Sequence, residues 1–339
     1  MANLVVTGPP ILGFKWDQLS REEETGFARD FYPESRHQEA RGYFHGGLAA
    51  AALLDAARIL FGPPANPTSV SVELRRLVPL GHDLRISVAQ TGETDFRGTL
   101  LHLRHPGWKA DPVDIPVVGE TRFTGPEPAP DIADIRELAL VPVPVPQEHE
   151  LFAGCFVCGQ DNTSGLQLLP GWHTDGRVVV SFHADERYTE ADRKGELSPL
   201  AVCALLSCPT LWANKHLLDE ADQSGALLTD YAVRFHRGVQ VGTNLRTIGI
   251  AGEPDADNLR GVSALVDDRG ELFATASASW RIVDEMPARE PGGAAPPSEE
   301  MPLKGGRPEA RSPDNWGQPL AGRREDAGPR SERPDGGGS

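Results

Sequence analysis

The sequence has 339 residues and carries 49 acidic against 33 basic side chains, a formal net charge of −16 at pH 7. Such an acidic chain is not expected to bind nucleic acid or an anionic membrane surface. No apolar run reaches the roughly 20 residues of a membrane-spanning helix, and the first residues lack the basic start of a signal peptide. Four cysteines are too few for a disulfide framework in a chain of this length, so we expect a cytoplasmic protein.

The first part of the chain predicts one short strand and then one long helix. Residues 1–30 mix turn signals with charge and predict a loosely packed opening segment, which leads into a strand at residues 27–32. In the run at 43–61 every face after the two glycines is apolar except at Asp55 and Arg58, which predicts a helix buried on most sides. The glycine and two prolines that follow this run end the helix.

Patterns rich in β-branched and apolar residues then predict an antiparallel sheet, and the same order returns later in the chain. The first set of strands is expected at residues 69–77, 84–91, 98–104 and 117–124. The second set is expected at residues 177–183, 229–235, 245–251, 260–267 and 272–283, with a second helix at 199–217. One helix with an antiparallel sheet, repeated, is an α+β pattern.

The two halves also repeat each other in sequence, which predicts a tandem duplication. Ala52-Leu53-Leu54 matches Ala204-Leu205-Leu206 at an offset of 152 (206 − 54), and the order of elements agrees throughout. A Pro-Val repeat predicts a stiff linker between the halves, and the Pro, Gly, Arg, Glu and Ser composition near the C-terminus predicts disorder. The expected parts are an N-terminal domain at residues 1–140, a linker at 141–150, a C-terminal domain at 151–284 and a disordered tail at 285–339.

A buried helix wrapped by an antiparallel sheet resembles the hotdog fold of acyl-CoA thioesterases. His45-Gly46-Gly47, followed by the run that reaches Asp55, resembles the active-site helix of the phenylacetyl-CoA-type thioesterases. A second motif, Cys155-Phe156-Val157-Cys158-Gly159-x-x-Asn162-x-x-Gly165-Leu166, is similar to a segment common in the same superfamily. The resemblance implies a tandem double hotdog that hydrolyses an acyl-CoA thioester without a metal or redox cofactor. Homo-oligomers formed through the sheets are compatible with it.

Thioester hydrolysis needs a polarised carbonyl and an activated water or carboxylate nucleophile. Gly46 and Gly47 would let a substrate approach the N–H groups of the helix start, where the dipole favours an oxyanion, with Leu48 beside them; alternatively, the glycines only allow a tight turn. Asp55 is the candidate base or nucleophile, and its alternative is a helix pair with Arg58.

The motif histidine would hold or polarise the thioester carbonyl, as its position in the family implies, or it would only cap the helix. The family acid usually follows this histidine by nine residues, whereas Asp55 follows His45 by ten (55 − 45). One extra residue turns a side chain by about 100° around a helix.

The second helix has no acid or base at the corresponding places. At the offset of 152, Ser207 corresponds to Asp55, and Ser198 and Pro199 correspond to the two glycines. Pro199 has no N–H to donate, so this copy predicts an inactive site in which the two serines are weak substitutes. In the family the pocket lies between two hotdogs, so the acid and the glycines of the first helix would serve two different pockets.

Further candidates concern the nucleotide of coenzyme A and the cysteine pair. Arg76 and Arg237 follow equivalent strands and would bind its phosphates, although we favour ordinary surface charge as their interpretation. Cys155 and Cys158 have the spacing of half a zinc site, but zinc needs about four ligands and no second pair follows. We therefore expect a structural turn there and no bound metal.

Two function classes follow from the sequence. The first is an acyl-CoA thioesterase that uses Asp55. The second is a protein that binds an acyl-CoA or fatty-acyl group but has lost efficient catalysis, as the serine in the second helix and the irregular spacing of the acid suggest. A hydratase of the same fold is a third option, for which the sequence shows no paired Asp and His in one loop-helix segment.

Overall fold

The computed structural model describes residues 4–17, 26–39, 42–62, 66–78, 80, 84–102, 116–125, 137, 139–140, 142–149, 151–191, 193–220, 225–254 and 258–283. All of these lie within one compact unit, Met1–Met301. The tail expected at residues 285–339 lies outside the described residues. Among the helices of the described ranges, none combines the length and the apolar character that crossing a membrane requires.

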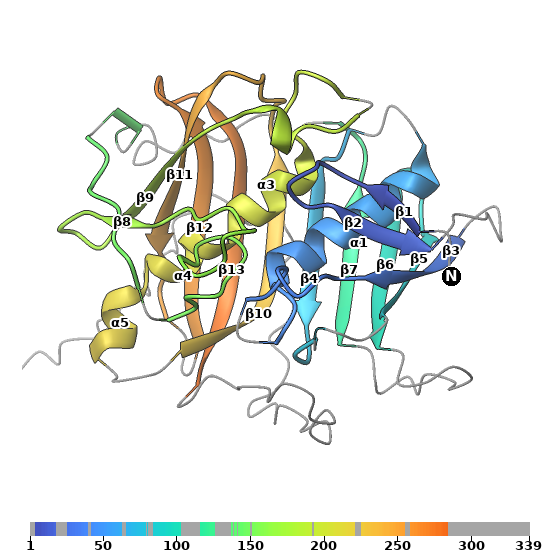
Figure 1. The fold of residues 1–339 in the computed structure, drawn as a ribbon, viewed down its shortest axis with the longest axis horizontal. Coiled ribbons are helices and arrows are strands. Elements are labelled where there is room, and N and C mark those ends of the chain that lie inside the picture. The colour runs from blue at the N-terminus through green and yellow to red at the C-terminus, as the bar shows by residue number, and fades with distance from the viewer. Residues whose placement is uncertain are drawn as a thin grey trace, which may run out of the picture. The chain divides into compact units, whose positions relative to one another are not determined.

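The strands of the described residues form one antiparallel sheet (Figure 1). In chain order they are β1 Leu4–Thr7, β2 Phe14–Asp17, β3 Gly26–Tyr32, β4 Ser69–Leu74, β5 Leu84–Gln90, β6 Asp95–His102, β7 Val117–Arg122, β8 Gly171–Trp172, β9 Val178–His183, β10 Gly225–Phe235, β11 Asn244–Ala251, β12 Asn258–Asp267 and β13 Leu272–Val283. In space the order is β1-β2-β3-β5-β6-β7-β4-β10-β13-β12-β11-β9-β8. Every strand expected from the sequence has a counterpart here, with ends that differ by a few residues.

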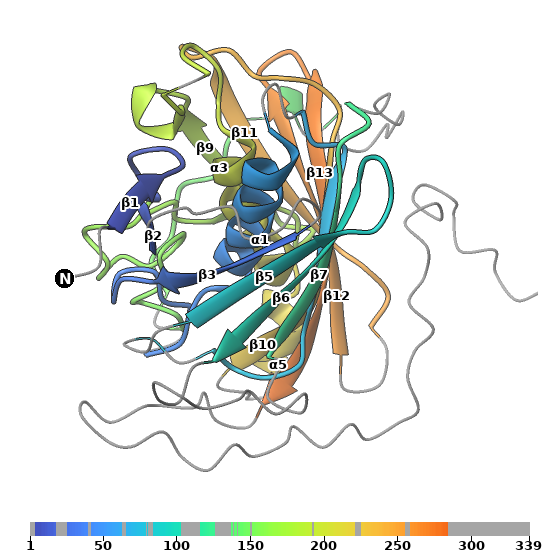
Figure 2. The ribbon, with the colours of Figure 1, turned by 90° about the vertical axis from the view of Figure 1, so that its right-hand side faces the viewer.

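The pair β4–β10 joins the strands of the first half to those of the second. The two strands run antiparallel, with Val70 opposite Val233 and Val72 opposite Tyr231. The sheet is therefore continuous across the repeat, and the main helices of both halves lie on one face of it (Figure 2).

Helix α1, Gly46–Phe61, packs against β4–β7 of its own half. It ends where the sequence predicts, because Gly62 adopts a φ of 85° and its N–H bonds to the Arg58 carbonyl. Its long run of alanines is almost completely buried. Leu53 reaches the sheet because β6 and β7 present Gly98 and Gly119 there: a Cβ on either glycine would lie 2.8 Å from a Leu53 methyl carbon.

The second helix differs from the prediction of one continuous helix at residues 199–217. It is divided into α3 Pro199–Leu205, α4 Ser207–Trp212 and α5 Lys215–Glu220, besides a short 3-10 turn η2 at Glu186–Tyr188. The first break has a local cause: Pro209 has no N–H to donate to the Leu205 carbonyl, and its ring would clash with that carbonyl in a continuous helix.

The opening segment is also different from the prediction. Part of it folds as the hairpin β1–β2. Along β2, buried and less buried side chains alternate as a half-buried strand requires, with Phe14 and Trp16 completely buried. The expected linker forms no helix or strand at residues 142–149, and its Val143 packs against an apolar cluster that includes Val179 and Ile248. Whether the chain divides into domains at residues 140 and 150 stays a prediction.

Candidate functional site

Helices α1 and α3 pack side by side, and this contact brings the candidate residues into two groups. The N-terminus of α1 meets the α3–α4 break: a Cβ on Gly47 would lie 2.8 Å from both Cβ and Oγ of Ser207. We call this group the α1 end. The second half of α1 lies near the N-terminus of α3, which we call the α3 end. The acid and the glycines of the first helix are thus held in different groups.

Asp55 lies at the α3 end and is only 4% exposed. Two donors from the β1–β2 hairpin hold the same carboxylate oxygen: Thr7 Oγ1 at 2.5 Å and Trp16 Nε1 at 3.1 Å. Burial raises the pKa of Asp55 to about 6, although the hydrogen bond from Thr7 and the charge of Arg58 oppose that rise. A carboxylate in this range accepts a proton readily near neutral pH.

A second buried carboxylate, Glu190, connects Asp55 to the start of α3. The ion pair suggested for Arg58 with Asp55 forms instead with Glu190, at 2.5 Å from Nη1 to Oε2. Ser198 Oγ donates to the other oxygen of Glu190 and accepts the N–H of Leu200 at 3.1 Å, which makes it the N-cap of α3. The α3 end therefore joins two carboxylates, one guanidinium and one hydroxyl.

At the α1 end, the N–H groups of Gly46 and Leu48 have side-chain acceptors. His45 is completely buried, and its Nδ1 accepts the N–H of Leu48 at 3.3 Å. Glu39 accepts the N–H of Gly46, and burial raises the pKa of that carboxyl to about 7, which the charge of His45 partly opposes. Leu48 itself lies in the main core. Ser207 Oγ donates to the Ala204 carbonyl at 2.8 Å.

Thiols gather beside His45. Its Nε2 lies 3.6 Å from Cys208 Sγ, and Cys208 Sγ lies 3.7 Å from Cys155 Sγ. All four cysteines of the chain are buried and reduced, and Cys203 on α3 is outside this cluster. Among the described residues, this is the place where side chains able to bind a metal ion converge.

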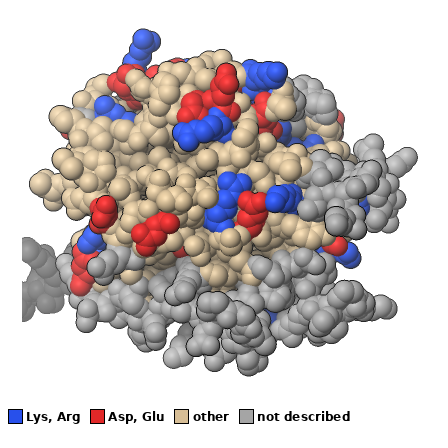
Figure 3. All heavy atoms as spheres, viewed as in Figure 1, with Lys and Arg blue, Asp and Glu red and all other residues tan. Residues whose placement is uncertain are grey.

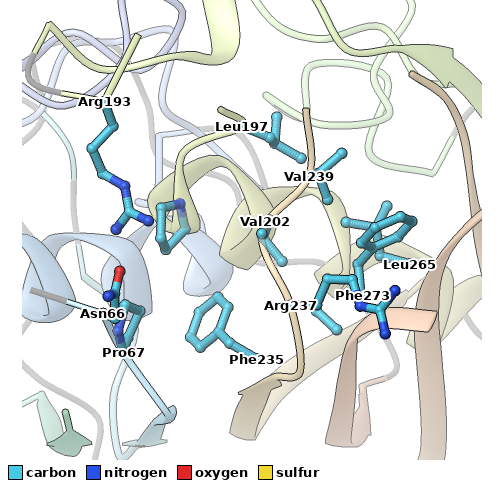
Figure 4. A pocket seen from close by; sticks show the side chains of 13 residues that line it. Asn66, Pro67, Arg193, Leu197, Val202, Phe235, Arg237, Val239, Leu265 and Phe273 are labelled. Carbon is cyan, nitrogen blue, oxygen red and sulfur yellow. The ribbon is translucent and has the colours of Figure 1, made fainter. Parts of the chain in front are cut away.

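A small pocket opens beside the first turn of α3 (Figure 4). Its wall is mostly apolar, and the side chains of Leu197, Val202 and Phe235 project toward it from different elements. Two cations, Arg193 and Arg237, stand at its sides. The pocket is small, with a volume of about 40 Å³, and it combines an apolar wall with two flanking cations.

The two arginines proposed for coenzyme A lie apart. Arg237 lines the pocket and forms an ion pair with Glu271. Arg76 follows β4, as Arg237 follows β10, and these strands run antiparallel, so the two arginines lie at opposite ends of the strand pair. On the face shown in Figure 3, acidic and basic side chains lie next to one another rather than in patches of one sign.

Several residues of these groups were not found from the sequence: Thr7, Trp16, Glu39, Glu190 and Cys208 as a neighbour of His45. Alternation around Trp16 was a signal for a buried strand. The internal repeat did not indicate Glu190, because at the offset of 152 the corresponding residue of the first half is Gln38, which is not an acid. The functional roles of the predicted site residues stay predictions.

Comparison with solved structures identifies the fold. A proposed thioesterase from Novosphingobium aromaticivorans is similar at 18% identity with a TM-score of 0.52, over 78% of this chain and 98% of that chain. Acyl-CoA thioesterase II from Mycobacterium marinum is similar at 14% identity with a TM-score of 0.51, over 84% of this chain and 99% of that chain. The dehydratase domain of a mycocerosic acid synthase-like polyketide synthase is similar at 14% identity with a TM-score of 0.50, over 82% and 98%.

No protein-family model matches the sequence, and no curated protein sequence matches it. The chain has the fold of hotdog-fold thioesterases and of this dehydratase domain. At these identities the likeness concerns the fold.

Proposed function

We propose that this chain is a double-hotdog acyl-CoA thioester hydrolase whose reaction depends on Asp55. The observation that carries the proposal is this carboxylate: it is buried on the central helix, has a pKa raised to about 6, and is held by two donors near the start of a second helix. The thioesterases that share the fold support the substrate class.

The double-hotdog layout is supported by the packing of each half. Helix α1 lies against β4, β5, β6 and β7, whereas α4 lies against β9, β11, β12 and β13. Each half thus offers one helical segment to one set of antiparallel strands, in the order that the internal repeat predicts. The pairing of β4 with β10 then takes the place of contact between two separate hotdog subunits.

At the α3 end, Asp55 would act as the general base. Its ionised carboxylate takes a proton from water while the water oxygen attacks the thioester carbon. The carbon–sulfur bond then breaks, and the leaving sulfur takes the proton back from Asp55, so that coenzyme A is released as a thiol and the product as the acid. Two N–H groups at the start of α3 are not available to the developing oxyanion: Pro199 has none, and that of Leu200 donates to Ser198 Oγ. The oxyanion would therefore be stabilised by the positive end of the α3 dipole. A carboxylate that instead attacks directly would require the same ionised Asp55.

The chemistry of the pocket beside Pro199 supports an acyl-CoA substrate, which the pocket would have to widen from about 40 Å³ to admit. An acyl group needs an apolar wall, which Leu197, Val202 and Phe235 supply. The nucleotide phosphates need a cation, and Arg237 stands at the side of the same pocket. We assign no role in binding the same nucleotide to Arg76, since it lies at the other end of the strand pair.

The test is release of free thiol, followed with a chromogenic reagent, across short, medium, long and aromatic acyl-CoAs. Asp55→Asn should lower kcat/KM by about 10²- to 10⁴-fold on the substrate that is turned over best. The matched control is Asp30→Asn, which removes a carboxylate that pairs with Arg85 on the strands and should leave turnover within about twofold. Unchanged turnover in folded Asp55→Asn protein would refute the assignment of the base.

One observation favours a second candidate, a protein that binds acyl-CoA without hydrolysing it. The β1–β2 hairpin covers Asp55 and supplies both of its donors, which leaves little room for water beside the carboxylate. If no acyl-CoA in the panel is turned over while one of them raises the melting temperature, the binding protein is the better description. Cytoplasmic location and homo-oligomers stay predictions.

A further inference from the structure

Three thiols and one imidazole meet in the core beside the N-terminus of α1, and the proposed hydrolysis uses none of the thiols. The ligand atoms of His45, Cys155 and Cys208 all lie within 4.8 Å of one another, and all three residues are buried. Cys158 is the nearest further thiol: it is buried, its charge state depends on those of Cys155 and Cys208, and it belongs to the same Cys-x-x-Cys turn as Cys155. These residues come from three segments: the α1 N-cap, the Cys-x-x-Cys turn and α4.

The spacing of these atoms fits a tetrahedral metal site. Zinc binds sulfur at about 2.3 Å and imidazole nitrogen at about 2.0–2.1 Å, so the edges of the tetrahedron are about 3.8 Å between two sulfurs and about 3.6 Å from sulfur to nitrogen. The corresponding distances are 3.7 Å from Cys155 Sγ to Cys208 Sγ and 3.6 Å from Cys208 Sγ to His45 Nε2. An ion bound by Cys155, Cys208 and His45 would fit these distances, and the Cys158 thiol would have to turn toward it to become the fourth ligand.

We propose that this cluster binds one zinc ion through four protein ligands: Cys155, Cys158, Cys208 and His45. Four protein ligands leave no open position, so the ion would be structural and would not activate water. It would fix the position of the α1 N-cap against α4 and the Cys-x-x-Cys turn. The proposal is independent of the hydrolase assignment, which rests on Asp55 at the α3 end.

Neighbouring groups support thiolates at these positions. Trp212 Nε1 donates to Cys158 Sγ at 3.3 Å, and the N–H of Val157 donates to Cys155 Sγ at 3.3 Å. Hydrogen bonds of this kind orient metal ligands and are expected around a bound thiolate. In addition, Glu39 Oε1 is buried, accepts no hydrogen bond among the described residues, and lies 3.9 Å from His45 Nε2, so one carboxylate oxygen without a donor lies next to the cluster.

Zinc binding has one local consequence. Coordination through Nε2 leaves the proton of His45 on Nδ1, so the 3.3 Å contact in which Nδ1 accepts the N–H of Leu48 would be lost. It would also remove the imidazole from the thioester chemistry that the sequence resemblance implies for it. Another nearby histidine, His149, is not a candidate, because its two ring nitrogens face the carbonyls of Leu151 and Cys158.

The sequence showed only half of this site. Cys155 and Cys158 have zinc spacing, but the other two ligands lie far away along the chain, at positions that no local pattern connects to them. Contact between the start of α4 and the N-terminus of α1 brings these two ligands to the turn.

The experiment measures metal per chain by mass spectrometry in full-length protein purified without chelator and again after incubation with zinc. We expect about one zinc per chain in the native sequence, and none above background in Cys155→Ser or Cys208→Ser. The matched control is Cys203→Ser, a buried cysteine of α3 outside the cluster, which should keep about one zinc.

A second measurement does not require the variants to fold. Cobalt added to the native protein after zinc removal should give the intense thiolate-to-metal absorption and the visible bands of a tetrahedral site, and a chelator should abolish both. Absence of zinc and of this spectrum would overturn the proposal, as would zinc retained in both variants. A Cys155–Cys208 disulfide in freshly purified protein, seen as the loss of two titratable thiols on unfolding, would overturn it too.

Discussion

The α1 end and the α3 end are related by the internal repeat, and yet they hold different chemistry. At the α1 end the helix starts with two glycines, and the residue of the second half that faces Gly47 is Ser207 rather than an acid. At the α3 end the acid is present as Asp55, but the helix starts with Ser198 and Pro199. Each end therefore keeps one feature of the site that the resemblance implies. The comparison teaches that turnover, if it occurs, has to come from the α3 end without glycine N–H groups.

The charge state of Asp55 is the first way to test this difference. Its folded pKa of about 6 lies above the ordinary value of 3.8, so its contribution to stability is present at low pH and is lost as the pH rises through about 6. A shift of this size corresponds to about 3 kcal/mol. We expect the free energy of unfolding of the native protein, relative to Asp55→Asn, to fall by up to about 3 kcal/mol between about pH 4 and pH 7.5, measured with urea.

Asp185→Asn is the matched control with the opposite sign. The hydrogen bond from Arg187 holds the pKa of Asp185 below its usual value, so this carboxylate stabilises the fold at higher pH and loses that effect on acidification. Equal pH dependence in the native protein and Asp55→Asn would show that Asp55 is ionised in a polar environment, and that the α3 end is more open than this structure indicates.

Packing at the α1 end is the second test. A Cβ added at Gly47 would lie 2.8 Å from the Ser207 side chain and 3.0 Å from the Cys203 carbonyl, so Gly47→Ala should destabilise the fold by about 1–3 kcal/mol. The measurement is urea unfolding. Ser207→Gly in the same chain should recover part of the loss, because it removes one of the two obstacles.

Gly238→Ala is the control for this pair. A Cβ at Gly238 meets its neighbours at 3.5–3.6 Å, an ordinary contact, so this change should stay within about 0.5 kcal/mol of the native protein. A neutral effect of Gly47→Ala would mean that α1 and the α3–α4 break are further apart than described, and the α1 end would then have room for a substrate.

Much of the fold could be predicted because its strands carry local patterns. Strand β11, for example, is rich in β-branched residues and bounded by turn signals, and its ends were found to within a residue. Two failures have physical reasons. The Pro209 break was visible in the sequence but was outweighed by the apolar composition around it. The β1–β2 hairpin was not predicted because each of its strands has only four residues, so the alternation around Trp16 is too short to indicate a strand by itself.

The candidate site was less predictable, because its contacts join residues far apart in the chain. The sequence could single out Asp55 as an acid on an apolar helix. It could not show that Thr7 and Trp16, 48 and 39 residues away, donate to this carboxylate. For the same reason the pair of Cys155 and Cys158 was read as a turn, since Cys208 approaches it only after α4 packs.

The smallest predicted effect concerns one of these donors. Thr7→Val removes the hydroxyl that donates to Asp55 Oδ2 at 2.5 Å, and loss of a hydrogen bond to the ionised form raises the pKa further. If Asp55 is the base, the acidic limb of kcat/KM should move to higher pH by about one unit, while the rate at high pH is nearly unchanged. Thr229→Val, which removes a hydroxyl bonded to the Ser279 carbonyl on another strand, should leave the limb in place. A lower rate at every pH in Thr7→Val would instead give the hairpin a role in binding substrate, and the α3 end would then differ from the α1 end in access as well as in charge.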